Sequence, residues 1–462
     1  MATQIKNIKS YVFLISKIIQ SRSIKTTNEI NIVIDSMHGI MLTSFLYVLV
    51  LLNFIYVKKI QPKITIVVEK KRKRFYPVNF IFTFFKNVEF RSLESSNLIS
   101  QDHKLDTTLK ENIKSIRDFK IDGINYGEFI LSGYIRNTRS SPNYQARTFK
   151  KHITKSLEYW HSAKNIYKEK KFDYAFMSHT SYHTFGSLFL NSLAANTFTV
   201  VLTPDHEYFT ARSYSKITDF TNILRNYPRS LDDKTSSLVL KPENINMNKI
   251  EKYFNERITG EDKFFEGNYQ KPIKNFHTFF KEKILSKSKN YKKIVLIASH
   301  QLWDDPLGNY KMIYDDYYSW LRETLILASM NRNVLWFIKP HPAERERGTN
   351  ESCEDIYNEV LRGKKNENII LLDSGFSSSS IFRYVDFILT VRGTISLEGA
   401  ASGVMPVTAG TGPISGYNLD ISSNNIDEYE KIMMTIHLID TKLSEEQITK
   451  SKVLLYNYIN KV

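Results

Sequence analysis

The sequence contains little cysteine, proline or glycine. Its 462 residues include one cysteine, Cys353, together with 12 prolines and 17 glycines. A single thiol excludes an internal disulfide and any metal site made of several cysteines, and a reducing cytosol suits such a chain. Because 42% of the residues are hydrophobic, the low proline and glycine content also argues against a long disordered tract.

The chain shows no secretory signal, because its first 30 residues lack a small-residue cleavage site after an apolar core. That segment is instead amphipathic, with apolar residues at helical spacing and basic residues between them. They are Ile5, Ile8, Val12, Ile15 and Ile19, with Lys6, Lys9, Lys17 and Arg22. Such a helix packs on the protein or lies on an anionic membrane face. We expect a cytoplasmic protein, with peripheral attachment to the inner membrane as the alternative.

One run is apolar enough to raise the question of a membrane span. Ile40 to Val57 are 18 residues without a charge, a length that can cross a bilayer. The segments "NIVID" before it and "KITIVVE" after it have the pattern of buried strands, however. A strand, an apolar helix and a second strand form a βαβ unit, so we favour a buried crossover helix.

The chain is basic, with a net charge of +16 and a pI of about 9.4. This excess suits an anionic partner such as nucleic acid, a phospholipid surface or a phosphorylated substrate; a lysine-rich genomic composition explains it equally well. The basic run Lys70–Arg74 lacks interleaved aromatic residues, so a solvated loop is favoured over a nucleic-acid site. We therefore expect no nucleic-acid partner, and a functional version of this loop would hold a lipid headgroup or an acidic glycan.

The length predicts two domains, and strands alternate with helices in both halves. This alternation predicts an α/β fold of two Rossmann-like domains with parallel sheets, facing a cleft. The boundaries expected are residues 1–265, a charged linker at 266–290, a second domain at 291–425, and C-terminal helices at 426–462 that could pack back on the first domain.

Ligands of open parallel sheets bind beyond the carboxyl ends of the strands, so the loops after the strands carry the candidate site. In the second domain these loops are "SHQLWDDPLG", "KPHPAERE", "SGFSSSS" and "RGTISLEG". These loops contribute the candidates for binding a ligand, which are called the donor-binding residues below: His300, Asp304, Lys339, His341, Arg392, Gly393, Thr394, Ser396 and Glu398.

Two of these loops suggest anion binding. Gly393 permits a sharp turn, Thr394 to Ser396 would open a helix whose free N–H groups favour phosphate, and Glu398 would accept hydrogen bonds from ribose hydroxyls. In "KPHP", the prolines would hold Lys339 and His341 in place as hydrogen-bond donors to a phosphate. Plainer interpretations exist for both: a strand-to-helix turn capped by Thr394, and a strand terminator with a solvated lysine and histidine.

"WFIKPHP", followed about 50 residues later by "DFILTVRGTISLEGAASGVMPV", resembles the second domain of bacterial capsule polysaccharide biosynthesis proteins. This group includes the β-Kdo transferases and is similar in its HP and Ser/Thr motifs to polysialyltransferases and CDP-glycerol-dependent polymerases. The resemblance covers residues 290–420, and "ASHQLWDDPLG" adds to it. It implies a GT-B glycosyltransferase of capsule or lipopolysaccharide biosynthesis.

The resemblance further implies that the second domain holds a nucleotide sugar, CMP-Kdo being one candidate. His341 and the Thr394/Ser396 turn would lie on its phosphate and Glu398 on its sugar or ribose. Such enzymes generally need no metal or other cofactor, and the chain has no HExxH motif. Alternative functions are glycerophosphate transfer from CDP-glycerol, sugar-nucleotide epimerisation, and a non-catalytic glycan-binding component of an export complex.

The acceptor, an oligosaccharide or lipid-linked glycan, would then bind the N-terminal domain. Its loops after strands offer Asp35 and His38 in "DSMHG", and Asp205 and His206 in "PDHEY". A carboxylate or imidazole in such a loop can deprotonate an acceptor hydroxyl. Each of them can instead cap a helix or bond to loop backbone.

Overall fold

A computed structural model describes residues 29–37, 41–69, 81–93, 116–141, 147–205, 208–218, 246–259, 261, 274–304, 312–363 and 366–460. The N-terminal amphipathic segment, the basic run at 70–74, His38 and His206 lie outside these ranges. Contacts divide the chain into two compact units. The first contains residues 1–137 and 142–223, and the second contains residues 138–141 and 224–462.

The first unit is built on a six-stranded sheet in the order β3-β2-β1-β6-β7-β8. Its strands are β1 Glu29–Asp35, β2 Gln61–Val68, β3 Val88–Ser92, β6 Tyr174–Met177, β7 Phe198–Asp205 and β8 Tyr208–Tyr214. All neighbouring strands pair in parallel except β7 and β8, which are antiparallel. The two predicted βαβ units are confirmed, since one joins β1 to β2 and the other joins β6 to β7.

The apolar run at 40–57 is the crossover of the first βαβ unit. It forms helix α2, Met41–Leu52, and the π-helical turn η1, Asn53–Val57. Tyr47, Val50 and Phe54 are buried in the core that covers β1 and β2. Within the described ranges, no helix is both long and apolar enough to cross a membrane.

The described part of the first unit also contains α6 Gly127–Thr138, α7 Arg147–Glu169 and α8 Tyr182–Ala194. They enclose two buried histidines, His152 and His183, whose ring centres lie 4.4 Å apart. His152 Nε2 bonds to the Ile130 carbonyl at 2.8 Å. A β-carbon on Gly133 would lie 2.0 Å from His183 Nδ1, so only glycine leaves space for this ring.

The second unit repeats the architecture with strands in the order β11-β10-β9-β12-β13-β14. They are β9 Lys293–Ala298, β10 Val334–Lys339, β11 Ile369–Leu371, β12 Phe387–Thr390, β13 Met405–Thr408 and β14 Ile421–Ser422, and every pair is parallel. Thus the predicted fold class of two Rossmann-like α/β domains is confirmed. β13 and β14 had not been recognised in the sequence.

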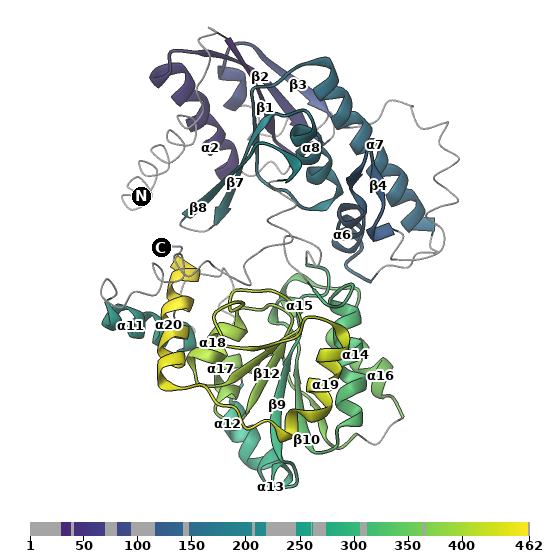
Figure 1. The fold of residues 1–462 in the computed structure, drawn as a ribbon, viewed down its shortest axis with the longest axis vertical. Coiled ribbons are helices and arrows are strands. Elements are labelled where there is room, and N and C mark those ends of the chain that lie inside the picture. The colour runs from purple at the N-terminus through teal and green to yellow at the C-terminus, as the bar shows by residue number, and fades with distance from the viewer. Residues whose placement is uncertain are drawn as a thin grey trace. The chain divides into compact units, whose positions relative to one another are not determined.

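Both faces of the second sheet are buried. Successive side chains of a strand point to opposite faces, and every residue of β10 is buried. On β10, Val334, Trp336 and Ile338 enter one hydrophobic core, and Leu335 and Phe337 enter the other. Helices lie on either side of the strands in Figure 1. The first core includes α14 Tyr317–Met330, α16 Cys353–Leu361 and α19 Ile426–Thr435, and the second includes α12 Phe276–Phe279, η5 Phe280–Ile284 and α17 Ser378–Phe382.

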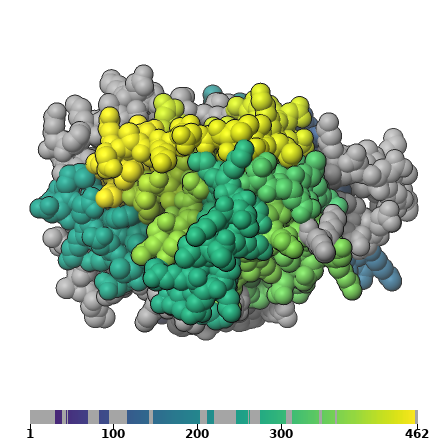
Figure 2. Space-filling model, turned by 90° about the horizontal axis from the view of Figure 1, so that it is seen from below, coloured from purple at the N-terminus to yellow at the C-terminus, as the bar shows by residue number. Residues whose placement is uncertain are grey.

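The units differ in extent from the predicted domains. The segment expected as a linker, 266–290, carries α12, η5 and α13 Leu285–Ser288, and Phe276, Phe280 and Ile284 are core residues of the second unit. Helix α11, Met247–Thr259, which had been placed in the first domain, belongs to the second unit and contacts α20, Glu445–Asn460. Figure 2 shows the C-terminal residues, in yellow, on the second unit next to the teal of α11. The C-terminal helices α19 and α20 therefore pack on the second unit.

The buried histidine pair predicts acid sensitivity. Burial lowers the pKa of His152 to about 4 and holds that of His183 well below its usual range. Stability that depends on neutral imidazoles is complete above about pH 6.5 and is lost as pH falls toward 4, by about 3 kcal/mol for His152. In urea unfolding followed by circular dichroism, His152→Gln should lose less stability than wild type over this interval. Parallel curves for the two proteins would contradict the prediction.

Candidate functional site

Each sheet has a switch point where the strand order reverses, and a ligand crevice is expected there. In the second sheet it lies between β9 and β12. Ser299 and His300 follow β9, and Val391 to Gly393 follow β12. KPHP ends the adjacent strand β10. The predicted loops therefore meet at one edge of the sheet.

A pocket of about 300 Å³ opens at this edge, a volume at the lower limit of small-molecule sites. Its wall is formed by the loops after β9, β10 and β12, by α17 and by α11. Lining residues with polar side chains are Arg257, Ser299, His300, Gln301, Asp304, Lys339, His341, Ser378, Thr390, Thr394 and Glu398. Seven predicted donor-binding residues are brought together here: His300, Asp304, Lys339, His341, Gly393, Thr394 and Glu398. Whether they bind a donor stays a prediction.

KPHP is a strand-to-helix turn with a buried lysine. Lys339 is the last residue of β10 and is only 3% exposed, so it is not the solvated side chain of the plainer interpretation. His341 is the N-cap of α15, Pro342–Arg347, and its Nδ1 accepts the Ala343 N–H at 3.1 Å. A neutral imidazole that accepts at Nδ1 carries its proton on Nε2. His341 therefore combines two roles, as a helix cap and as a potential donor to a ligand.

A carboxyl group lies behind the turn. Glu344 of α15 accepts the Cys353 N–H at 3.2 Å, which joins α15 to the start of α16. Burial raises the pKa of Glu344 to about 7, although the Cys353 N–H and the charge of Lys339 oppose the rise. Burial likewise raises the pKa of the Cys353 thiol, so this cysteine is not a reactive nucleophile.

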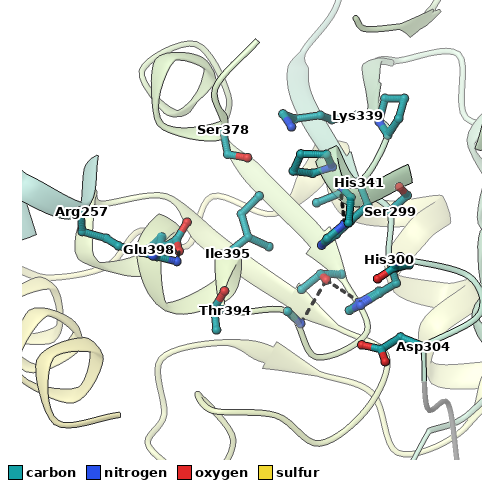
Figure 3. A pocket seen from close by; sticks show the side chains of 17 residues that line it. Arg257, Ser299, His300, Asp304, Lys339, His341, Ser378, Thr394, Ile395 and Glu398 are labelled. Atoms are coloured by element: carbon teal, nitrogen blue, oxygen red, sulfur yellow. Dashed lines mark hydrogen bonds and ion pairs between the residues drawn. The ribbon is translucent and has the colours of Figure 1, made fainter. Parts of the chain in front are cut away.

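His300 holds the loop after β12. Its Nε2 accepts the Val391 N–H at 3.1 Å and lies 2.9 Å from Thr390 Oγ1, whose oxygen in turn accepts the Gly393 N–H (Figure 3). Its ring stacks on Tyr317 at 4.3 Å. Burial, with the nearby charge of Arg392, holds the pKa of His300 well below its usual range. His300 is therefore a neutral acceptor that shapes the pocket.

The loop after β12 differs in part from the prediction. Arg392 Nε donates to the Tyr317 hydroxyl at 2.5 Å, and neither Arg392 nor Ser396 lines the pocket. Ser396 is fully buried and bonds back to the Gly393 carbonyl. Thr394 is the N-cap of α18, Ile395–Ala401, but its side chain makes no capping bond. Thr394 lines the pocket. The plainer interpretation is therefore correct in the strand-to-helix turn but wrong in the capping bond of the threonine side chain.

Glu398 lines the pocket as part of an ion pair that the sequence did not reveal. Arg257 donates from Nε at 3.1 Å and from a terminal nitrogen at 2.7 Å to Glu398 Oε1. Both residues are buried, at 5% and 2% exposure, and both line the pocket. Arg257 lies in α11, a region whose weak periodicity had concealed any role. Seven residues, about two helical turns, separate Arg257 from Ile250, so the two buried residues of α11 lie on one face.

In the first unit, Asp35 ends β1 at the switch point between β1 and β6. Its carboxylate accepts the Ser178 N–H at 2.6 Å and the Ser178 hydroxyl at 3.0 Å. It is 2% exposed, and burial raises its pKa to about 6 despite these bonds. Asp205 ends β7 and pairs through its backbone with Tyr208. The proposed catalytic roles of Asp35, His38, Asp205 and His206 stay predictions.

Among the residues that the structure describes, no group of three or more His, Cys, Asp or Glu side chains could hold a metal ion. The pocket is lined by hydroxyls, the Gln301 amide, two histidines, a lysine, the exposed carboxylate of Asp304 and the Arg257–Glu398 pair. This set of groups suits an anion that also carries hydroxyls.

Neither a protein-family model nor a curated protein sequence matches the chain. Similar solved structures include KpsC, the β-Kdo 2,4 transferase of Thermosulfurimonas dismutans, with 12% identity, 60% of this chain and 78% of that chain covered, and a TM-score of 0.32. The trehalose-6-phosphate phosphatase N-terminal domain of Candida albicans is 11% identical, with 95% of this chain and 94% of that chain covered and a TM-score of 0.33. The UDP-GlcNAc 2-epimerase of Methanocaldococcus jannaschii is 10% identical, with 94% of this chain and 100% of that chain covered and a TM-score of 0.27. At these values the fold class rests on the chain's own strand order.

His300→Phe should destabilise the second unit. Phenylalanine can retain the stack on Tyr317, but it leaves the Val391 N–H without its acceptor, and a buried unsatisfied donor costs about 1–3 kcal/mol. Chemical denaturation should show this loss. An unchanged free energy of unfolding would contradict the role of His300 as the acceptor that holds the loop.

Asp35 should make the first unit less stable as pH rises. Its folded pKa of about 6 lies above the 3.8 of an unperturbed aspartate. The folded state therefore favours the protonated form, and the associated stability is lost as pH rises from 3.8 through 6. The stability of wild type relative to Asp35→Asn should fall by about 3 kcal/mol over this interval. Urea unfolding of both proteins at pH 3.5 to 7.5 measures the difference, which should stay constant if Asp35 does not titrate.

Proposed function

We propose that the protein is a glycosyltransferase that moves a sugar from a nucleotide donor to a glycan acceptor, with the donor's phosphates in the pocket of the second unit. The observation that carries this proposal is the placement of Lys339 and His341 at the pocket wall beside the switch point of a parallel sheet. The resemblance of "WFIKPHP" and "RGTISLEG" to capsule polysaccharide biosynthesis proteins supplies the reaction class.

The chemistry of this transfer suits the pocket. When a sugar leaves its donor, negative charge grows on the departing nucleotide phosphate. Donors that are already oriented stabilise that charge without reorganising during the reaction. The Lys339 ammonium is buried, and the His341 ring is held by its own capping bond. Both groups can therefore stabilise the leaving phosphate, and the reaction we propose uses no metal.

The finer assignment rests on the resemblance. It makes a CMP-linked sugar such as CMP-Kdo the candidate donor and an oligosaccharide or lipid-linked glycan of capsule or lipopolysaccharide biosynthesis the acceptor. The acceptor would bind the first unit, where Asp35 or His38 would take the proton from the attacking hydroxyl. A cytoplasmic protein attached to the inner membrane surface fits this reaction.

Nucleotide binding tests the proposal. Isothermal titration calorimetry with CMP, CDP and UDP should show binding to the wild type, and nucleotide sugars should then be screened for transfer. Loss of one charge-assisted contact in Lys339→Met should weaken binding by about tenfold or more. His341→Asn should weaken it too, because asparagine keeps a good N-cap but lacks the imidazole Nε2.

Lys293→Met is the matched control. Lys293 begins β9 at the opposite end of the sheet and lies near Asp386 and Asp440, so its loss should leave nucleotide affinity unchanged. Absence of binding for every nucleotide would overturn the proposal. Reaction with CDP-glycerol but with no nucleotide sugar would replace it with glycerophosphate transfer.

A further inference from the structure

The Arg257–Glu398 ion pair is an unexpected part of the lining of a pocket that would bind an anion. Figure 3 shows Glu398 with Arg257 on one side of Ile395, and Lys339 and His341 on the other. A carboxylate in this position repels a phosphate, and its burial makes the repulsion stronger than it would be in water. The glutamate is therefore compatible with an anionic ligand only if its charge is cancelled.

We infer that Arg257 is a positioning residue of the ligand pocket that acts through Glu398. Its guanidinium cancels the charge of Glu398 and fixes the carboxylate as a hydrogen-bond acceptor for ligand hydroxyls, so that one pocket accepts a phosphate and a polyol together. This inference deepens the proposed function and rests on it for the identity of the ligand as a nucleotide sugar.

The energetics favour a functional reason for the pair. Burying two charges costs several kcal/mol each, and well-packed apolar residues often stabilise a fold as well as or better than the ion pair does. α11 also has other attachments to the second unit. Lys452 of α20 pairs with Glu251 at 2.9 Å, and the Ser379 hydroxyl donates to the Ile258 carbonyl at 2.7 Å. The Arg257–Glu398 pair is thus not the sole tether of the helix.

The test removes the two charges separately and together. The probe is inorganic pyrophosphate, which has no sugar hydroxyls, and calorimetry measures its affinity. Arg257→Met leaves Glu398 uncompensated and should weaken pyrophosphate binding by about tenfold. Glu398→Gln should tighten it. Arg257→Met/Glu398→Gln should return to within about threefold of wild type, since the net charge at positions 257 and 398 is again zero.

Glu251→Gln is the matched control, because it weakens the attachment of the same helix outside the pocket. It should leave pyrophosphate affinity at the wild-type value, and a thermal melt of each variant reports folding. If Arg257→Met does not fold, Glu398→Gln alone still decides the matter, since unchanged or weaker pyrophosphate binding would overturn the inference.

The remaining outcomes separate the two proposals. A double variant that binds as weakly as Arg257→Met, or an Arg257→Met variant that binds like wild type, overturns the role assigned to Arg257. If the wild type binds pyrophosphate but no nucleotide, the proposed function fails while the variants still decide the role of Arg257. Binding of neither probe by the wild type overturns both.

Discussion

Backbone N–H groups just beyond the ends of parallel strands at a switch point require acceptors when they are buried. Each sheet of this protein meets the requirement with one side chain from the neighbouring strand end. His300, after β9, accepts the Val391 N–H beyond β12, and Asp35, at the end of β1, accepts the Ser178 N–H beyond β6. The form of the loops at each switch point depends on these bonds.

This constraint divides the polar residues of the second unit by task. His300 must stay neutral to accept at Nε2, so it does not provide positive charge to a ligand. Arg392 extends along Tyr317 and Ser396 bonds to its own turn. Among the predicted loops that line the pocket, KPHP is therefore the one that brings a cationic side chain, Lys339. Its prolines and the capping bond of His341 reduce the conformational entropy that a ligand would otherwise have to remove.

The sequence predicts this fold well where apolar runs are long. "NVLWFI" is hydrophobic at successive positions because both faces of its strand are covered, and that pattern identifies a parallel sheet. β14 is only two residues long, too short for any periodicity. The aromatic segment around Phe276 resembles a linker because its neighbours are charged, and only the tertiary structure shows that its rings fill the core below the sheet.

The site shows the same division between local and distant information. Lys339, His341 and Thr394 could be found because each lies at or just beyond the end of a strand, and chain order alone places such residues at one edge. Arg257 could not be found in this way. It is 141 residues from Glu398, on a helix outside the alternation of strands and helices, and an isolated arginine in a basic chain carries no signal.

This separation also bears on how much of the chain the second unit needs. A fragment that began at β9 would contain every strand of the second sheet, but it would lack Arg257 and leave the Glu398 carboxylate without its cation. Removing one partner of a buried ion pair costs far more than the intact pair contributes. We therefore expect α11, which lies ahead of the first strand, to be required for the stability of the second unit.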